Sequence, residues 1–278
     1  MGERMTRGRI ELTGTLAVIG GGRMGEAIIS GLLTGEALSP DAIVVAEPDA
    51  DRRDQLETNY GITCVADGRD ALDGAHIVLL AVKPQVIDEV ARSLAERIGS
   101  AIVISIAAGI SCARLESLLP SGTVVVRVMP NTPAMVGEGM SVVSGGTEAD
   151  SAQVGLVRDL FGFLGESIVI DERHQDAATA ISGSGPAYVA LFVDSLARAG
   201  VRQGLTREVA QALAIQTVRG TAGLLERTGM HPEELVDSVA SPGGTTIAAI
   251  EALESGGLRP AVAQAVAAAV KRAKELGA

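Results

Sequence analysis

Short, wholly apolar segments rich in β-branched residues alternate with helical patterns through the first half of the chain, from Thr15 to about Ile170. Strands that are apolar throughout and separated by helices are typical of a parallel sheet covered on both faces. Two weaker strand candidates flank a helix expected over about 149–164 and extend the sheet. The pattern therefore predicts a doubly wound α/β sheet, with strands at Leu16–Gly20, Ile43–Glu47, Ile62–Val65, His76–Val82, Ile102–Ile106, Thr123–Val128, Ser141–Ser144 and Ser167–Ile170.

After residue 171 the β-branched runs end and the pattern becomes helical. Pro186 and Thr206 are placed to open helices that reach about Ala199 and Arg227, Pro232 opens a short helix, and Pro260 opens a last helix rich in alanine. No linker rich in proline or serine separates the halves. We predict a flexible extension over residues 1–14, an α/β domain over 15–172 and an all-helical domain over 173–278.

Composition and charge exclude several classes of protein. With 278 residues, 47% of them apolar, and a mean hydropathy of +0.31, the chain is expected to fold rather than stay disordered. Its longest apolar stretches are far shorter than the roughly 18 residues that span a bilayer. A net charge of −11 disfavours nucleic acid and anionic membranes as partners. Two distant cysteines and three scattered histidines predict no metal site. The first 14 residues lack the apolar core of a signal peptide, which favours a cytoplasmic protein.

A glycine motif follows the first predicted strand and opens the first helix, expected over Met24–Leu33. It has the spacing G-x-G-x-x-G, which allows a tight turn and a close approach of a pyrophosphate to helix N–H groups. The string alone is weak in a chain with 34 glycines, but its position between strand and helix is the context that dinucleotide binding requires. The candidate cofactor-binding residues here are Gly20, Gly22, Arg23, Met24 and Gly25.

An acidic residue, Glu47, ends the second predicted strand, 22 residues after Gly25. A carboxylate at this position accepts a hydrogen bond from the adenosine ribose and disfavours a 2′-phosphate. The alternative is a solvated acid at a strand end. Arg52 and Arg53 follow closely and could pair with that phosphate, or could form an exposed helix face. The choice between NADH and NADPH therefore stays open.

Two further segments end the fourth and fifth predicted strands. Ligands of open α/β sheets bind at the carboxyl ends of the strands, so these segments are expected beside the ribose and the nicotinamide. Lys83 is one of only three lysines, the alternative being an ordinary solvent lysine. The candidates are Ala81, Val82, Lys83 and Pro84 after the fourth strand, and Ala107 and Ala108 after the fifth.

Two glycine-rich segments, Ser182–Tyr188 and Ser241–Thr246, each open a helix in the second half. A glycine turn leading into a helix exposes N–H donors that can bind a carboxylate, and the alternative is a tight turn with a Ser or Thr cap. Neither segment contains His, Cys or Lys, so a reaction without a strong acid or base is favoured. Hydride transfer to a C=N bond fits, because a protonated imine is already electrophilic.

The segments GGGRMGEAI, AVKPQ, SIAAGI, RVMPNTP, SGSGPAY and SPGGTT, in this order, closely resemble the pyrroline-5-carboxylate reductase family over about residues 15–276. The resemblance implies an N-terminal Rossmann domain and a helical C-terminal domain that binds substrate and interleaves with a second subunit. It implies reduction of Δ1-pyrroline-5-carboxylate to L-proline by NADPH or NADH, the last step of proline biosynthesis. It also implies a homodimer, with dimers assembling into a homodecamer.

The resemblance also assigns roles by position. The glycine turn would hold the pyrophosphate, Val82 and Lys83 the ribose, and Ala107 and Ala108 the nicotinamide side. Two positions of this chain depart from the common pattern of the family. Glu47 stands where relatives preferring NADPH often have a small hydroxyl residue, and Gly68 stands where many have Asn. Both bear on the cofactor preference.

For the substrate, the resemblance implies that the N–H groups beside Gly243 and Gly244, with Thr245 and Thr246, bind the carboxylate. The Thr246 hydroxyl would face the ring nitrogen, which makes it the candidate catalytic group. Glu172 matches an acidic position near substrate, the alternative being an acid at the start of a helix. Ser184, in SGSGPAY, completes the candidate substrate-binding set.

Two rival interpretations make different demands on the sequence. A β-hydroxyacid dehydrogenase shares the glycine motif but needs a lysine in its helical half, and none lies between Lys83 and Lys271. A regulator that binds a dinucleotide without turning it over has no use for two carboxylate-binding segments.

Overall fold

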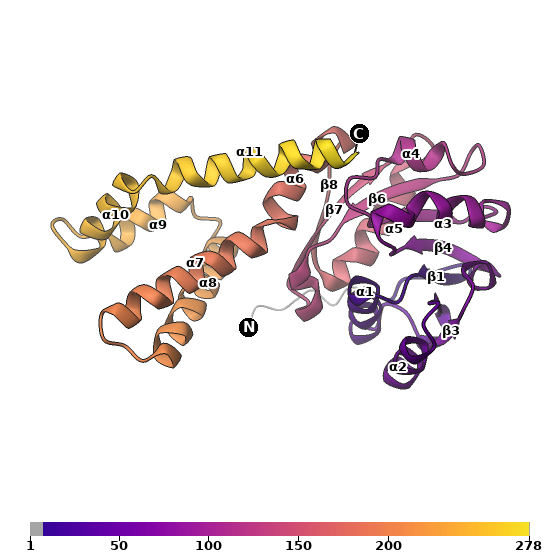
Figure 1. Cartoon of the computed structure of the whole chain (residues 1–278), viewed down its shortest axis with the longest axis horizontal. Helices are drawn as coiled ribbons and strands as arrows, with labels where there is room; N and C mark the ends of the chain where they lie inside the picture. Colours follow the sequence, from indigo (N-terminus) through magenta and orange to yellow (C-terminus); the bar gives the residue numbers. More distant parts are fainter. Residues whose placement is uncertain (1–7, 278) are drawn as a thin grey trace. The chain divides into compact units, whose positions relative to one another are not determined.

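The structure is a computed structural model that describes residues 8–277 (Figure 1). The chain divides into two compact units: the residues up to Gly183 with those from Val270 onward form the first, and Ser184–Ala269 the second. The sequence predicts the boundary after residue 172, whereas the segment from Glu172 to Gly183 groups with the sheet. Ile10 and Leu12 pack against the apolar core, so this part of the predicted flexible extension is packed on the first unit. Residues 1–7 lie outside the described part.

An eight-stranded sheet with the order β3-β2-β1-β4-β5-β6-β7-β8 forms the centre of the first unit. Strands β1 to β6 are parallel, which confirms the predicted doubly wound sheet. The strands are β1 (Thr15–Ile19), β2 (Ile43–Ala46), β3 (Thr63–Val65), β4 (Ala75–Leu80), β5 (Ile102–Ser105), β6 (Val125–Met129), β7 (Gly139–Gly145) and β8 (Gly165–Val169).

Strand β7 runs antiparallel to β6, and β8 runs parallel to β7. The connection from β6 to β7 consists of residues 130–138 and contains only a 3-10 helix, Thr132–Val136. A parallel crossover needs a dozen or more residues, so this short connection turns the chain back on itself. The two outer strands thus extend the sheet as predicted, but in a mixed rather than an all-parallel arrangement.

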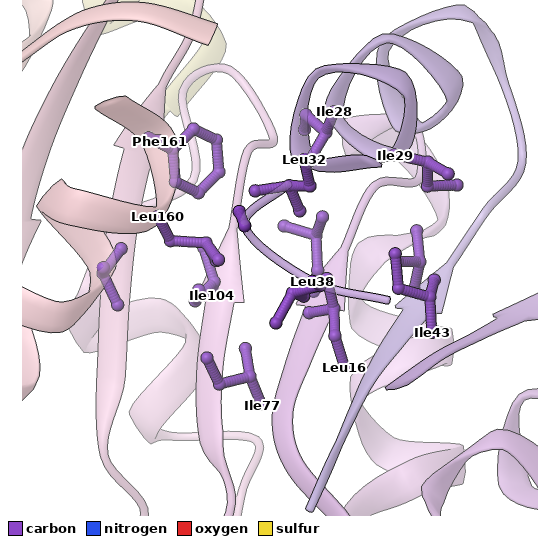
Figure 2. Packing of buried hydrophobic residues seen from close by; sticks show 14 of the residues in the cluster. Leu16, Ile28, Ile29, Leu32, Leu38, Ile43, Ile77, Ile104, Leu160 and Phe161 are labelled. Carbon is purple, nitrogen blue, oxygen red and sulfur yellow. The ribbon is translucent and has the colours of Figure 1, made fainter. Parts of the chain in front are cut away.

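The first unit has an apolar core on each face of the sheet. In β1, Leu16 and Val18 belong to one core while Ala17 and Ile19 belong to the other, because successive side chains of a strand point to opposite faces. Figure 2 shows the first core, in which helix residues such as Phe161 and Leu32 lie on one side of strand residues such as Leu16. Five helices accompany these strands: α1 (Arg23–Thr34), α2 (Ala50–Tyr60), α3 (Ile87–Leu94), α4 (Cys112–Glu116) and α5 (Ser151–Phe161).

The segment that leaves the sheet is helical almost throughout. A 3-10 turn, Glu172–His174, leads into α6 (Gln175–Ala178) and then into a π-helical turn, Thr179–Gly183, directly before α7 (Gly185–Arg202). Gln175 is fully buried, and its Nε2 donates to Val142 O at 3.1 Å. Because the residues before α7 form a π-helical turn, they are not the irregular glycine turn that the sequence predicts. Gly185 does open a helix, as predicted.

The second unit contains the helices that the sequence predicts. After α7 come α8 (Arg207–Thr228), α9 (Pro232–Val239), α10 (Thr245–Ser255) and α11 (Leu258–Gly277), whose last residues belong to the first unit. Thr206 caps α8 by accepting from Val209 N at 3.3 Å. Helix α11 begins two residues before Pro260, which is tolerated in a first turn because the N–H it lacks has no intrahelical partner there.

Very little of the second unit is buried. Helices α7 and α8 pack closely where Gly200 meets Ala210, and Ala197, Ala210 and Ala214 are its buried apolar residues in the described part of the chain. Large apolar side chains are instead exposed, among them Leu191 at 69% and Leu213 at 55%. The helical unit therefore presents an apolar surface much larger than its own core.

Within residues 8–277, no helix is both long and apolar enough to cross a membrane.

Candidate active site

Four adjacent parallel strands end at one edge of the sheet. In the order β2-β1-β4-β5 they are followed by Glu47, Gly20, Ala81 and Ile106 respectively. The chain leaves β1 toward β2 on one side, while β4 lies on the other side, so the strand order reverses at β1. Open α/β sheets bind their ligands in the crevice just outside such a reversal point. The predicted cofactor-binding residues are thus gathered along one edge.

The glycine turn between β1 and α1 fits a bound pyrophosphate. Gly20 has a φ of +108°, and a Cβ there would lie 2.7 Å from Ala81 O. A Cβ on Gly25 would lie 2.4 Å from Gly20 O, so both positions require glycine. At Gly22 an added Cβ meets no described atom within 4 Å. Gly22 is also the N-cap of α1 and has no side chain to satisfy the first N–H groups. Open space beside free N–H donors is what an anion needs.

Gly21 contributes to the same turn, although the motif leaves this position unspecified. A Cβ on Gly21 would lie 2.6 Å from Leu56 Cδ1, on α2. Its N–H donates to Glu47 Oε2 at 2.9 Å. This contact arises from the packing of α2 beside the turn, so the sequence pattern could not have shown it.

Glu47 is fixed at the end of β2 rather than free in solvent. Besides the bond from Gly21, its Oε1 accepts from Asp49 N at 3.1 Å, and the residue is half-buried. Two backbone donors orient the carboxylate beside the glycine turn. This position is consistent with the predicted hydrogen bond to the ribose, which remains a prediction.

The two arginines at the start of α2 also turn toward this region. Arg52 Nε donates to Gly21 O at 2.8 Å, and Arg53 Nη1 donates to Glu47 O at 2.8 Å. Both residues are half-buried, so they do not form the exposed helix face that was one of the two sequence-based interpretations.

The residues after β4 and β5 lie where the sequence predicts. Ala81 N donates to Ile19 O at 2.9 Å and so continues the pairing of β4 with β1. Lys83 is exposed and is the N-cap of a 3-10 turn that begins at Pro84. Ala107 is buried and Ala108 is exposed. At Gly68, an added Cβ would lie 3.1 Å from Leu94 Cδ2.

Glu172 has well-defined partners within the first unit. Its Oε1 accepts from Cys112 N, the first residue of α4, at 2.7 Å, and lies 3.4 Å from Arg127 Nη1. The Arg127 side chain is only 8% exposed, and its Nη2 lies 3.5 Å from Asp176 Oδ1. These contacts favour the interpretation of Glu172 as a structural acid at the start of a helix. Its predicted contact with substrate stays a prediction.

The buried thiol beside Glu172 is not a nucleophile. Burial, with the nearby Glu172 carboxylate as a further cause, raises the pKa of Cys112 to about 12. A thiol needs a lowered pKa to react at neutral pH. The raised pKa therefore argues against a nucleophilic role for the Cys112 thiol.

The remaining candidate substrate residues begin two helices of the second unit. Ser184 is the N-cap of α7, and its side chain makes no capping bond within the described chain. Gly243 has a φ of +68°, and an added Cβ on Gly244 would lie 2.3 Å from Ser241 Oγ. Gly244 is the N-cap of α10, and Thr245 and Thr246 are its first two residues.

A threonine at the start of a helix can either cap the backbone or present its hydroxyl to a ligand, and the geometry of α10 bears on this choice for Thr246. The cap position belongs to Gly244, which has no side chain, so the Thr246 hydroxyl is not the N-cap. The first N–H groups of α10 have no intrahelical partners and can bind a carboxylate.

The doubly wound sheet, the glycine turn and the fixed acid after β2 together define a dinucleotide-binding oxidoreductase fold. Residues 15–109 match a family model described as NADP oxidoreductase, coenzyme F420-dependent, and residues 172–276 match one described as pyrroline-5-carboxylate reductase dimerisation. The chain belongs to the pyrroline-5-carboxylate reductase family. The predictions of an NAD(P)-dependent oxidoreductase, and of this family in particular, are confirmed.

Relatives match the chain over nearly its whole length. A pyrroline-5-carboxylate reductase from Synechocystis is 44% identical, over 94% of this chain and 98% of its own. One from Corynebacterium melassecola is 43% identical, over 95% and 98%. Among solved structures, the enzyme from Coxiella burnetii has a TM-score of 0.91 at 36% identity, covering 96% of this chain and 100% of that one. The Plasmodium falciparum structure, solved with NADP bound, has a TM-score of 0.87 at 31% identity, covering 98% and 100%.

Proposed function

We propose that this protein reduces Δ1-pyrroline-5-carboxylate to L-proline by hydride transfer from NADH or NADPH to the C=N bond, the last step of proline biosynthesis. The observation that carries the proposal is the match to a pyrroline-5-carboxylate reductase that is 44% identical over 94% of this chain. The open glycine turn at Gly20–Gly25, where the first N–H groups of α1 have no intrahelical partner, supports the binding of the dinucleotide. The NADP-bound relative of the same fold supports it further.

The first unit supplies the binding of the cofactor. The bound dinucleotide contributes the hydride, and the chain's own residues hold it at the edge of the sheet. Gly22, Arg23, Met24 and Gly25 present backbone N–H groups to the pyrophosphate, and Glu47 accepts from the adenosine ribose. Val82 and Lys83 bind the second ribose. The small side chains of Ala107 and Ala108 leave room for the nicotinamide ring.

The second unit supplies the binding of the substrate. The N–H groups at the start of α10, with Thr245, hold the carboxylate, and Ser184 completes the set that this unit supplies. Through its hydroxyl oxygen, Thr246 accepts a hydrogen bond from the protonated ring nitrogen and orients the imine. The imine carbon accepts the hydride, and the electron pair of the C=N bond moves to the nitrogen, which keeps its proton. No acid or base stronger than a hydroxyl is required, because the protonated imine is electrophilic by itself.

The working protein in this proposal is a homodimer. The exposed apolar side chains of α7 and α8, such as Leu191 and Leu213, form a surface that a soluble monomer rarely leaves uncovered. The match of residues 172–276 to a dimerisation model supports a second copy as the covering partner. Assembly of dimers into a homodecamer and residence in the cytoplasm are further parts of the proposal, supported by the family resemblance and by the sequence.

The proposed activity is tested by incubating the protein with pyrroline-5-carboxylate and either NADH or NADPH. We expect oxidation of the cofactor and formation of proline. Robust turnover of a β-hydroxyacid without turnover of the cyclic imine would instead assign the chain to the rival dehydrogenase class. Binding of either cofactor without any turnover would support the regulator.

The role of Thr246 is tested with a matched pair of variants. Thr246→Ala should lower kcat by about tenfold or more, since about 1.4 kcal/mol of lost transition-state stabilisation is a factor of ten. Its Tm should stay nearly unchanged, because Gly244 and not Thr246 is the N-cap of α10. Thr245→Ala is the control, since its backbone N–H still serves the carboxylate. Normal turnover with a lowered Tm in Thr246→Ala would show a purely structural role.

A further inference from the structure

The glycine turn is linked to α2 through the side chain of Arg52, and the acceptors of this side chain are specific. Its Nη2 donates to Glu26 Oε2 at 2.5 Å, its Nε to Gly21 O at 2.8 Å, and its Nη1 to Gln55 Oε1 at 3.3 Å. The Arg52 side chain is 23% exposed. Each nitrogen of the guanidinium therefore has an acceptor within the protein.

Glu26, on the first turns of α1, is held from its other side as well. Its Oε1 accepts from the Tyr60 hydroxyl at 3.1 Å. The hydrogen bond from Arg52 is the main cause that lowers the pKa of Glu26, whereas burial, followed by Glu26, raises the pKa of Tyr60. At neutral pH the carboxylate is therefore charged and the phenol is protonated. The charged carboxylate accepts from Arg52, and the protonated phenol donates to the same carboxylate. These two hydrogen bonds keep Glu26 in place as the partner of Arg52.

This arrangement decides what the region can offer to a 2′-phosphate. Arginine binds phosphate by two parallel hydrogen bonds from its planar guanidinium. Arg52 already directs one hydrogen from each of its three nitrogens to an acceptor in the protein while Glu26 holds it. Arg53 donates from Nη1 to both Glu47 O and Pro48 O at 2.8 Å. Glu26 and Glu47 add two negative charges near the same turn, and these repel the charge of a phosphate.

We propose that Glu26, steadied by Tyr60, tethers Arg52 away from the 2′-phosphate of a bound cofactor and so acts as a specificity-determining residue in favour of NADH. Glu26 does not touch the reacting atoms and acts through Arg52. The inference rests on the proposed function in one respect, namely that a dinucleotide binds at the glycine turn. Glu47 then disfavours the phosphate directly, while Glu26 removes the cation that would attract it.

The test measures binding rather than turnover. Isothermal titration calorimetry is carried out with NAD⁺ and NADP⁺, and with the fragments 5′-AMP and 2′,5′-ADP. The variant Glu26→Gln keeps the size of the side chain but removes its charge, and so weakens its hold on Arg52. Since a charge-assisted contact to phosphate is gained, Kd for NADP⁺ and 2′,5′-ADP should fall by about tenfold, with Kd for NAD⁺ and 5′-AMP changing by less than about twofold.

Three further variants make the result specific. Adding Arg52→Met to Glu26→Gln should abolish the gain, because the guanidinium is the group that binds the phosphate. Tyr60→Phe removes one hydrogen bond to Glu26 and should shift the ratio of the two Kd values in the same direction by a smaller factor, about threefold. Asp54 is an exposed acid on α2. Asp54→Asn changes the net charge by the same amount as Glu26→Gln and should leave the ratio of the two Kd values unchanged.

Several outcomes would overturn the proposal that Glu26 holds Arg52 away from the 2′-phosphate, which is called the tether below. An unchanged ratio in both Glu26→Gln and Tyr60→Phe, each folded by circular dichroism, would do so. A tenfold loss of NADP⁺ affinity in Arg52→Met alone would show that Arg52 already binds the phosphate. Wild-type protein that binds none of the four compounds overturns both the tether and the proposed function, whereas normal binding and turnover with an unchanged ratio overturns the tether alone.

Discussion

Removal of the Glu172 carboxylate tests whether this residue holds the fold or contacts the substrate. In Glu172→Ala, the N–H of Cys112 loses an acceptor at 2.7 Å and the buried Arg127 loses one of its two carboxylate partners, at 3.4 Å. A charge-assisted hydrogen bond contributes about 1.5–3 kcal/mol. We assign about 2 kcal/mol to the short bond and about 1 kcal/mol to the longer contact. The free energy of unfolding should therefore fall by about 3 kcal/mol.

This loss is measurable as a change in Tm. About 1 kcal/mol shifts the Tm of a domain of this size by roughly 2–4 °C, so Glu172→Ala should melt about 6–12 °C lower. Glu172→Gln keeps an oxygen for both donors and loses only the charge, so its Tm should fall by about 2–4 °C. Melting is followed by circular dichroism at one fixed protein concentration, because association shifts Tm by mass action. KM for pyrroline-5-carboxylate is measured in parallel and should change by less than about threefold.

The control is Asp159→Ala. Asp159 pairs with the neighbouring Arg158, and both side chains are about half exposed, so its Tm should stay within about 2 °C of wild type. A Tm of Glu172→Ala equal to that of the control, with KM for the imine raised about tenfold or more, would refute the structural assignment and establish Glu172 as a substrate ligand.

Four shorter predictions follow from other contacts. Glu47→Ser should shift preference toward NADPH by about tenfold, and a wild-type enzyme that already strongly prefers NADPH would contradict this. The protein should sediment as a dimer or larger at micromolar concentration, and Leu213→Asp should dissociate or aggregate it; an active monomer would refute the dimer. Because its folded pKa is lowered, Glu26 stabilises the fold above its unfolded pKa of about 4.3 and loses this effect as the pH falls through the lowered folded pKa. The Tm difference between wild type and Glu26→Gln should therefore shrink as the pH falls below the unfolded value. Burial raises the pKa of Cys64 to about 11, so iodoacetamide at pH 8 should label it about a hundredfold more slowly than free cysteine.

The sequence predicts the parallel part of the sheet well because those strands are buried on both faces. A segment such as Ile43–Ala46 must then be apolar at every position, which no exposed loop requires. The direction of β7 could not be predicted in this way. It depends on the length of the connection over residues 130–138, and that length becomes known only once the strand limits are known.

The segment from Glu172 to Gly183 was harder to predict for a different reason. Its attachment to the sheet depends on polar contacts, above all the fully buried Gln175 and the pairing of Arg127 with Glu172 and Asp176. Hydrophobic periodicity assigns polar residues to the surface, so these contacts leave no signal in the pattern.

The candidate site shows the same division. Gly20, Gly25 and Glu47 could be predicted because a local motif and a fixed spacing specify them. The partners that orient the region come from distant positions: Gly21 meets Leu56, and Glu26 meets Tyr60 and Arg52. Such pairings are set by how α1 and α2 pack, and neither helix encodes them alone.

The small core of the second unit has a consequence for how the protein is made in the cell. Ordering each residue costs roughly 1–2 kcal/mol of conformational entropy, and burial of Ala197, Ala210 and Ala214 cannot offset this for five helices. In the proposed dimer, the missing burial comes from a second chain. Folding of the helical half then becomes a second-order reaction, whose rate rises with the concentration of newly made chains. A chain without a partner keeps a folded sheet domain but an exposed helical half, which proteases and chaperones recognise. The supply of active enzyme is thereby coupled to the rate of its own synthesis.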